Sequence, residues 1–149
     1  EFLVWAQKDK HSASLQRIQI IKGSITNNGA RPSEKVFDVV CSDGLEVDPT
    51  THRCPDNGAR VNIEDCSITN NVGATELKAT WRDPDFNPKD KAFYYVRVLE
   101  NPTCRWSTWD ALKAGIKPRS DLHETIQERA WSSPIWYIPV PEDIDIFAL

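Results

Sequence analysis

The stretch that most constrains the fold is an alternating run of apolar and aromatic residues, AFYYVRVLE at positions 92–100. β-Branched and aromatic residues fit the pleated surface of a sheet, where successive side chains point to opposite faces. One face carries Ala92, Tyr94, Val96 and Val98, and the other carries Phe93, Tyr95, Arg97 and Leu99. Because both faces are largely apolar, we predict a strand at the centre of a sheet.

Shorter segments with the same β-prone character surround this strand. We predict strands at 2–6 (FLVWA), 15–22 (LQRIQIIK), 35–41 (KVFDVVC), 75–81 (TELKATW) and 134–140 (PIWYIPV). The last contains two prolines, which favour the edge of a sheet. A short strand is expected at 59–63, and 124–130 fits either a helix or a polar edge strand. Asn28-Gly29 predicts a hairpin turn.

One short helix is predicted at 107–114 (STWDALKA). Ser107 or Thr108 is the expected N-cap, because a hydroxyl oxygen can accept a free backbone N–H of the first turn. Asp110 is expected in that first turn, where a carboxylate interacts favourably with the helix dipole. Gly115 is expected to end the helix.

These elements predict a mainly β fold: an antiparallel β-sandwich, immunoglobulin-like or a related barrel, with one short helix and long loops. Parallel α/β folds are disfavoured because their helical connections are missing. The 149 residues fit a single β-rich domain over 1–149. Residues 141–149 are expected to form a surface or disordered tail. The start at Glu1, directly before a strand, is expected for a mature product or an excised piece of a larger protein.

Charge and hydropathy exclude some classes of partner. The net charge is -4 and the pI is near 5.4, which argues against a nucleic-acid-binding surface, because phosphate binding needs clustered Lys and Arg. No apolar run approaches the ~20 residues that span a bilayer, so membrane insertion is not expected.

The four cysteines, Cys41, Cys54, Cys66 and Cys104, are even in number, and three lie in a loop-rich quarter of the chain. We expect two disulfides and therefore an oxidising compartment, periplasmic or secreted. Three pairings are open, and we favour Cys54–Cys66 with Cys41–Cys104. The alternatives are reduced cysteines or a zinc site with His52, although the compact C-x2-C spacing of most structural zinc sites is missing.

The best candidate contact residues are Arg105, Trp106 and Trp109 at the start of the predicted helix. Aromatic rings with an arginine can form a stacking platform for a sugar or another flat ligand. The alternative is that both tryptophans pack the helix onto the domain or onto a neighbouring domain. The same two interpretations apply to Trp131 and Trp136.

No catalytic or metal-binding residue is assigned from local motifs. The histidines are far apart and lie in polar segments. The segment DPDFN at 83–87 has the alternating oxygen ligands of a calcium loop, but Pro88 and Tyr94 stand where glycine and a bidentate glutamate are required. An Asp/Pro turn whose side chains cap their own backbone is the favoured interpretation.

Four segments resemble a bacterial family catalogued as domain of unknown function 3604. They are EKVFDVVCSDG, ELKATWRDPDFNPKDKAFYYVRVLENPTCRWSTWDA, TIQERAWSSPIWY and the opening FLVWAQKDKHSASLQRIQIIKG. The resemblance runs from about Phe2 to Tyr137 and concerns the C-terminal part of that family. Its members are much longer and commonly exported, and their N-terminal part resembles the PHP-type metal-dependent phosphoesterases.

This resemblance implies a non-catalytic C-terminal β-domain of an exported PHP-like metal-dependent hydrolase, with the N-terminal catalytic domain as its partner. The metal motifs are not in this chain, so no cofactor is assigned to it, and a divalent metal is expected in the parent protein. The alternative is a free-standing extracellular binding module for a carbohydrate or other ligand. A third hypothesis is an enzyme whose site assembles His123, Asp110 and Arg105.

Overall fold

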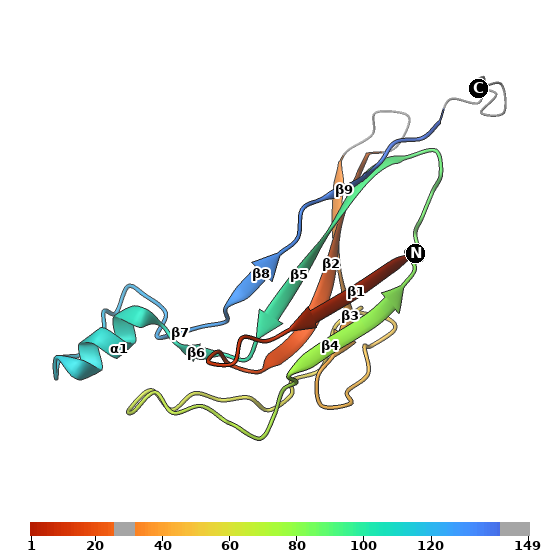
Figure 1. Cartoon of the computed structure of the whole chain (residues 1–149). Helices are drawn as coiled ribbons and strands as arrows, with labels where there is room; N and C mark the ends of the chain where they lie inside the picture. Colours follow the sequence, from red (N-terminus) through yellow and green to blue (C-terminus); the bar gives the residue numbers. More distant parts are fainter. Residues whose placement is uncertain (26–31, 141–149) are drawn as a thin grey trace.

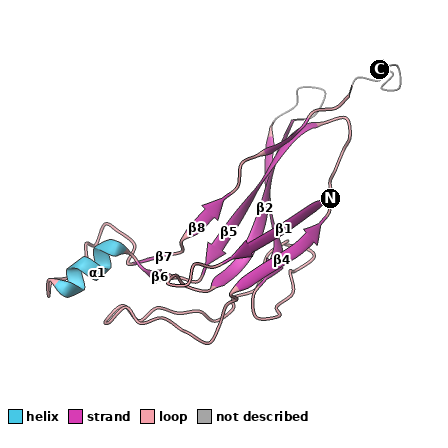
Figure 2. Ribbon diagram, viewed as in Figure 1, coloured by secondary structure: helices cyan, strands magenta, loops and turns pink. Residues whose placement is uncertain are grey.

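The computed structural model describes residues 1–25 and 32–140, and this part of the chain is mainly β, as predicted (Figures 1 and 2). The elements in chain order are β1 (Phe2–Gln7), β2 (Leu15–Ile25), β3 (Ser33–Cys41), β4 (Glu76–Trp81), β5 (Lys91–Glu100), β6 (Thr103–Cys104), α1 (Trp106–Lys113), β7 (Thr125–Ile126), β8 (Arg129–Trp131) and β9 (Ile135–Tyr137). Asn28-Gly29 and residues 141–149 lie outside the described residues.

The strands form antiparallel sheets that do not close into a barrel over the described ranges. The large sheet has the order β3-β2-β5-β8, and β9 pairs with β5 beyond β8. A second sheet consists of β1 and β4, and a third, very small one consists of β6 and β7. Strand β5 is therefore central, as its alternating sequence predicts, because it pairs with β2 on one side and with β8 and β9 on the other.

The core lies between the inner face of the large sheet and the β1–β4 sheet. Apolar side chains at every second position of the strands meet there, as the period-2 pattern requires. The central buried residues are Val4, Leu15, Ile18, Ile20, Leu77, Ala92 and Tyr94, with Val96 and Val98 partly buried beside them. The face of β5 that carries Ala92, Tyr94, Val96 and Val98 is thus the inward one, and the arrangement is sandwich-like.

The second layer covers only part of the large sheet. Strand β4 contacts β3 and β2, while β1 contacts β2. The inner face near β9 is less covered: Ile135, which pairs in register with Tyr94, remains largely exposed. A two-stranded layer on a five-stranded one leaves this margin open because it is too narrow to cover it.

One buried ion pair spans the two layers. Lys22 on β2 lies on the same face as Ile18 and Ile20, and its Nζ is 2.5 Å from Oδ2 of Asp83. The hydroxyl of Tyr94 donates to the same Oδ2 at 2.8 Å. Both charges are therefore partnered, which is the condition under which charged groups are tolerated in an interior.

Several local predictions differ from the structure. The strand expected at 59–63 is reduced to an isolated bridge between Val61 and Ile68, because the surrounding loop is held mainly by turns. The ambiguous segment at 124–130 forms β7 and the start of β8, so its edge-strand interpretation is the correct one. The predicted edge strand at 134–140 is confirmed but shorter, as β9.

The prediction of two disulfides is confirmed, but the predicted pairing is wrong. Cys41 pairs with Cys54, and Cys66 pairs with Cys104, so the zinc alternative is also excluded at these residues. Cys54 is drawn to the end of β3 because its backbone N–H donates to the buried Asp38. Cys66 is then left to anchor the long loop to β6.

Candidate functional site

The candidate residue Arg105 lies at the corner between β6 and α1, at one end of the molecule (Figure 1). Its backbone N–H donates to the carbonyl of Glu124 at 2.9 Å, and the hydroxyl of Thr108 donates to the same carbonyl at 2.8 Å. These bonds tie the start of α1 to the segment before β7. The corner is thus fixed from both sides of the chain.

The helix begins one residue earlier than predicted. Arg105 is the N-cap, with no side-chain capping bond, and the first turn holds no acidic residue. Neither Ser107 nor Thr108 is the cap, because Thr108 uses its hydroxyl for the Glu124 carbonyl. The C-terminal prediction is confirmed: Gly115 follows the C-cap with φ of +66°, a conformation that glycine adopts without strain.

The three candidate residues do not share one pocket. Arg105 lines a polar pocket together with His123, whereas Trp109 lines a different one beside the Cys66–Cys104 disulfide. Trp106 is 69% exposed and Trp109 is 42% exposed, so both rings are accessible. Of the residues in the enzyme hypothesis, His123 and Arg105 meet in one pocket, whereas Asp110 is not part of its lining.

Aromatic side chains also remain exposed on the large sheet. Trp131 on β8 is 59% exposed and Trp136 on β9 is 67% exposed. Trp136 lies beside Phe93, with ring centroids 5.2 Å apart. The sequence signal for these residues, the pattern AWSSPIWY, predicts strands correctly but does not reveal which face stays uncovered.

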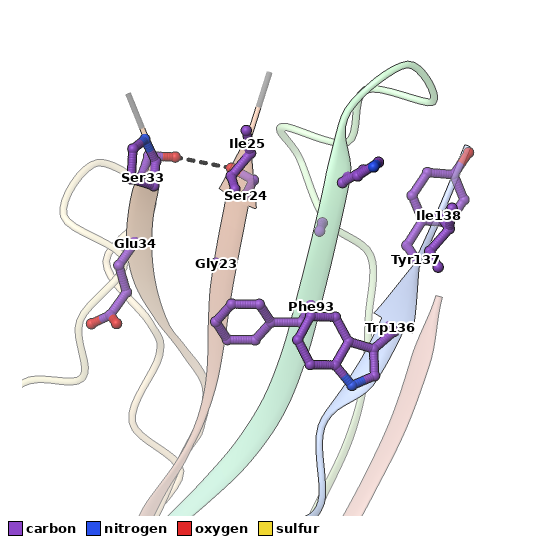
Figure 3. Close-up of a pocket in the computed structure, with 12 residues that line it drawn as sticks. Gly23, Ser24, Ile25, Ser33, Glu34, Phe93, Trp136, Tyr137 and Ile138 are labelled. Carbon is purple, nitrogen blue, oxygen red and sulfur yellow. Dashed lines mark hydrogen bonds between the residues drawn. The ribbon is translucent and has the colours of Figure 1, made fainter. Parts of the chain in front are cut away.

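An apolar pocket of about 590 Å³ lies where β2, β5 and β9 approach one another (Figure 3). The ring of Phe93 crosses over Gly23, and a Cβ at Gly23 would lie 2.3 Å from that ring. Trp136 lies beside this ring in Figure 3. A glycine inside a strand pattern is a signal of such close approach, and sequence reasoning missed it here.

The 83–87 segment is a self-capping turn, as favoured from the sequence. The backbone N–H of Asp85 donates to Oδ1 of Asp83, and that of Lys89 donates to Oδ1 of Asn87. Asp85 also pairs with Lys35 at 2.7 Å, and this bond lowers the pKa of Asp85. The acidic side chains thus stabilise the turn and hold the buried Lys22.

Within residues 1–25 and 32–140, no cluster of three or more His, Cys, Asp or Glu side chains could hold a metal ion. Over the same ranges, no helix has the length and apolar character needed to cross a bilayer.

Comparison with known proteins gives one match. The model of a family described as "Protein of unknown function (DUF3604)" matches residues 1–139. No curated protein and no solved structure matches the chain.

Proposed function

This chain belongs to the DUF3604 family of proteins of unknown function, and we propose that it is a non-catalytic β-domain that packs against a catalytic domain of the same protein. The proposed parent is an exported, PHP-like metal-dependent hydrolase with this chain as its C-terminal domain. In that arrangement the divalent metal and its ligands belong to the catalytic domain. The two disulfides support the oxidising compartment that export implies.

The observation that carries the proposal is the exposure of large aromatic and aliphatic side chains along β8, β9 and the residue that follows. We call this surface the apolar margin; it consists of Trp131, Ile135, Trp136 and Ile138, each more than half exposed. Large apolar side chains exposed together along one sheet edge are typical of a surface that contacts a partner. Tryptophan also dominates the binding energy of many interfaces.

The apolar margin adjoins the part of the large sheet that the β1–β4 layer leaves open. Ile135 faces this opening beside Phe2 and Tyr94, while Trp136 faces the opposite side with Phe93. A partner domain that wraps around this sheet edge would cover Ile135 on the inner side and Trp136 on the outer side. The Arg105–Trp106 corner, where Trp106 is exposed, would form an additional contact with that partner at the other end of the sheet.

The first test is the mass of the natural protein, purified from its source. We expect a product several times larger than the 17.0 kDa of this chain. A mature protein of about this size would overturn the accessory-domain proposal.

The second test addresses the apolar margin within that natural product. Trp136→Ser is expected to weaken domain packing, which limited proteolysis between the domains and thermal unfolding would both reveal. Ile116→Ser is the matched control, because Ile116 is about as exposed (64% against 67%) but lies after α1, away from the margin. Equal behaviour of the two variants would contradict packing through Trp136.

The non-catalytic role has its own assay. The chain alone, incubated with Mn²⁺ or Zn²⁺ and a panel of phosphoesters and esters, is expected to show no metal-dependent turnover. Robust turnover would mean that the chain carries an active site itself.

A second candidate function is a free-standing binding module for a carbohydrate. The supporting observation is the exposure of Trp106 and Trp109, three residues apart on α1, where side chains lie on neighbouring positions of one helix surface. A glycan array compared with Trp109→Ala tests it. No binding, or binding that the substitution leaves unchanged, counts against this function.

A further inference from the structure

A polar pocket of about 560 Å³ lies at the end of the molecule that carries β6, β7 and α1 (Figure 1). Segments that are distant in sequence meet there: the start of β2, the loop before β4, the β6–α1 corner, and the stretch from His123 to Arg129. Its charged and polar lining includes Asp56, Arg60, Arg105, His123, Gln127 and Arg129. No local sequence motif links these residues.

The central feature of the pocket is an unsatisfied guanidinium. Nε of Arg105 is buried, yet it has no hydrogen-bond partner among the described residues. Leaving a buried charged donor unpaired is unfavourable, and such a group is satisfied by an acceptor that enters the site. Arg105 lines the pocket, so an acceptor bound there lies within reach of this side chain.

The Arg129 guanidinium also has few partners in the described part of the chain. Its Nε donates to the carbonyl of Gln127 at 3.4 Å, a weak bond, and no ion pair joins it to an acid in the described part of the chain. His123 adds an imidazole from the opposite segment. Gln127 itself is held in place, because its amide donates to Oε1 of Gln16 at 2.8 Å and to the carbonyl of Glu100 at 3.0 Å.

The one acid of the lining is already occupied. Asp56 forms a two-pronged pair with Arg60, with contacts of 3.1 and 2.6 Å. The Arg60 guanidinium lowers the pKa of Asp56 to about 2, so this carboxylate stays ionised. Three guanidinium groups against one carboxylate leave an excess of two positive charges in the pocket.

Arg17 on β2 experiences like charges from other strands. Burial lowers the pKa of Arg17; Asp38 opposes that shift, but Arg53, Arg97 and Arg129 add to it. Arg17 and Arg53 each lie 3.6 Å from the Asp38 carboxylate, so their charges are partly compensated. Of these four arginines, Arg129 is the one that lines the pocket and adds to its excess of positive charge.

We propose that this pocket binds a tetrahedral dianion, a phosphate or sulfate group, either free or as the terminal group of a small molecule. The charge excess matches a dianion, and guanidinium groups match its oxygens in geometry. The Arg105 guanidinium donates to one oxygen, while Arg129 and His123 contact others. This site goes beyond packing against a catalytic domain and does not depend on it.

The test is calorimetric titration of the natural full-length protein, treated with a chelator so that no bound metal competes for phosphate. The probes are inorganic phosphate, sulfate, glucose 6-phosphate, and acetate and glucose as controls. Arg105→Gln and Arg129→Gln are the site variants. Arg119→Gln is the matched control, because Arg119 is an exposed arginine paired with Asp121 outside this pocket.

Phosphate and sulfate are expected to bind the unmodified protein and Arg119→Gln alike. Each site variant is expected to raise the dissociation constant about tenfold or more, as loss of a hydrogen bond to a charged group implies. Tighter binding of glucose 6-phosphate than of phosphate identifies a terminal group as the source, and equal or weaker binding identifies the free ion; both support the site.

Three results would overturn the proposal. They are the absence of binding by either dianion, binding that neither site variant weakens, and binding of acetate as tight as that of phosphate. Circular dichroism of each variant, read against Arg119→Gln, separates loss of binding from loss of folding. Arg129→Gln keeps the test decisive if Arg105→Gln unfolds, since Arg129 is an exposed residue of an edge strand.

Discussion

Two ends of the molecule treat positive charge in opposite ways. Near the start of β5, the Lys22 ammonium is buried, but it lies against Asp83, the Asp85 carbonyl and the Tyr94 ring. At the α1 end, the Arg105 guanidinium is partly buried and its Nε has no partner in the described part of the chain. A fully partnered charge stabilises the fold, whereas an unpartnered one is available to bind.

This contrast separates charges that support the fold from charges that are available to bind a ligand. Removing a partnered buried group leaves its partner uncompensated, so folding suffers. Removing an unpartnered group leaves nothing uncompensated, so folding is spared and binding is lost. The difference is measurable, because both groups lie in one chain and can be tested under the same conditions.

The largest effect is expected for Asp83→Ala. It leaves the Lys22 ammonium buried without its carboxylate, which lowers the free energy of unfolding by about 3–5 kcal/mol. Urea unfolding followed by tryptophan fluorescence measures the change. Lys35→Met is the control, since it removes the exposed pair with Asp85 and should cost at most about 1 kcal/mol. If both variants lost the same free energy of unfolding, the buried Lys22–Asp83 pair would contribute no more than the exposed Lys35–Asp85 pair.

The two disulfides are expected to contribute different amounts of stability, and the one that closes the longer loop should contribute more. Cys66–Cys104 spans 38 residues and Cys41–Cys54 spans 13. The chain-entropy relation gives roughly 4 and roughly 3 kcal/mol. Denaturant unfolding of the paired Cys→Ser variants measures both. If the variant without Cys41–Cys54 were the less stable of the two, contacts near Asp38 would affect stability more than loop length does.

Tyr94→Phe removes one bond to Asp83 and is expected to lower the free energy of unfolding by about 1–3 kcal/mol at neutral pH. Burial, and then the hydrogen bond to Asp83 and its charge, raise the pKa of Tyr94 well above its ordinary value. The resulting stabilisation is complete below the unfolded-state pKa of about 10 and is lost as pH rises above it.

The alkaline part of this prediction is checked by unfolding at a series of pH values between about 8 and 11. The unmodified protein should lose stability at the upper end more steeply than Tyr94→Phe. Parallel pH profiles would show that Tyr94 contributes nothing to the alkaline response.

The smallest effect is expected for Arg105→Gln. Because Nε of Arg105 has no hydrogen-bond partner in the described part of the chain, replacing this side chain should change the free energy of unfolding by no more than about 0.5 kcal/mol. The measurement is the urea unfolding used for Asp83→Ala. A loss comparable to that of the buried aspartate would show that Arg105 has a structural role, and the contrast between the two ends would fail.

The extent of correct prediction follows from how local each feature is. The β5 strand and its inward face were predictable because alternation is written into its own sequence and burial then follows. The helix start was missed because Thr108 bonds to the carbonyl of Glu124, which is distant in sequence. The local sequence around Thr108 does not show that this carbonyl lies beside its hydroxyl.

The cysteine pairing was missed for a related reason. Sequence spacing favours cross-links within the loop, but Cys54 is held at the end of β3 by its backbone bond to Asp38. The candidate residues Arg105, Trp106 and Trp109 were chosen as a group because they are adjacent in sequence. Arg105 and Trp109 line different pockets, since Arg105 is an extended residue before the helix whereas Trp109 lies within it.

The sequence by itself determined that this chain is a disulfide-bonded, antiparallel β-protein with β5 at its centre, because periodicity, turn residues and cysteine number are local or additive properties. Only the tertiary structure decided which positively charged side chains lie close together. A net charge of -4 predicts an acidic surface, yet contacts between distant segments bring Arg105 and Arg129 into one pocket. Net charge is a sum over the whole chain, whereas a binding site depends on which residues are neighbours in space.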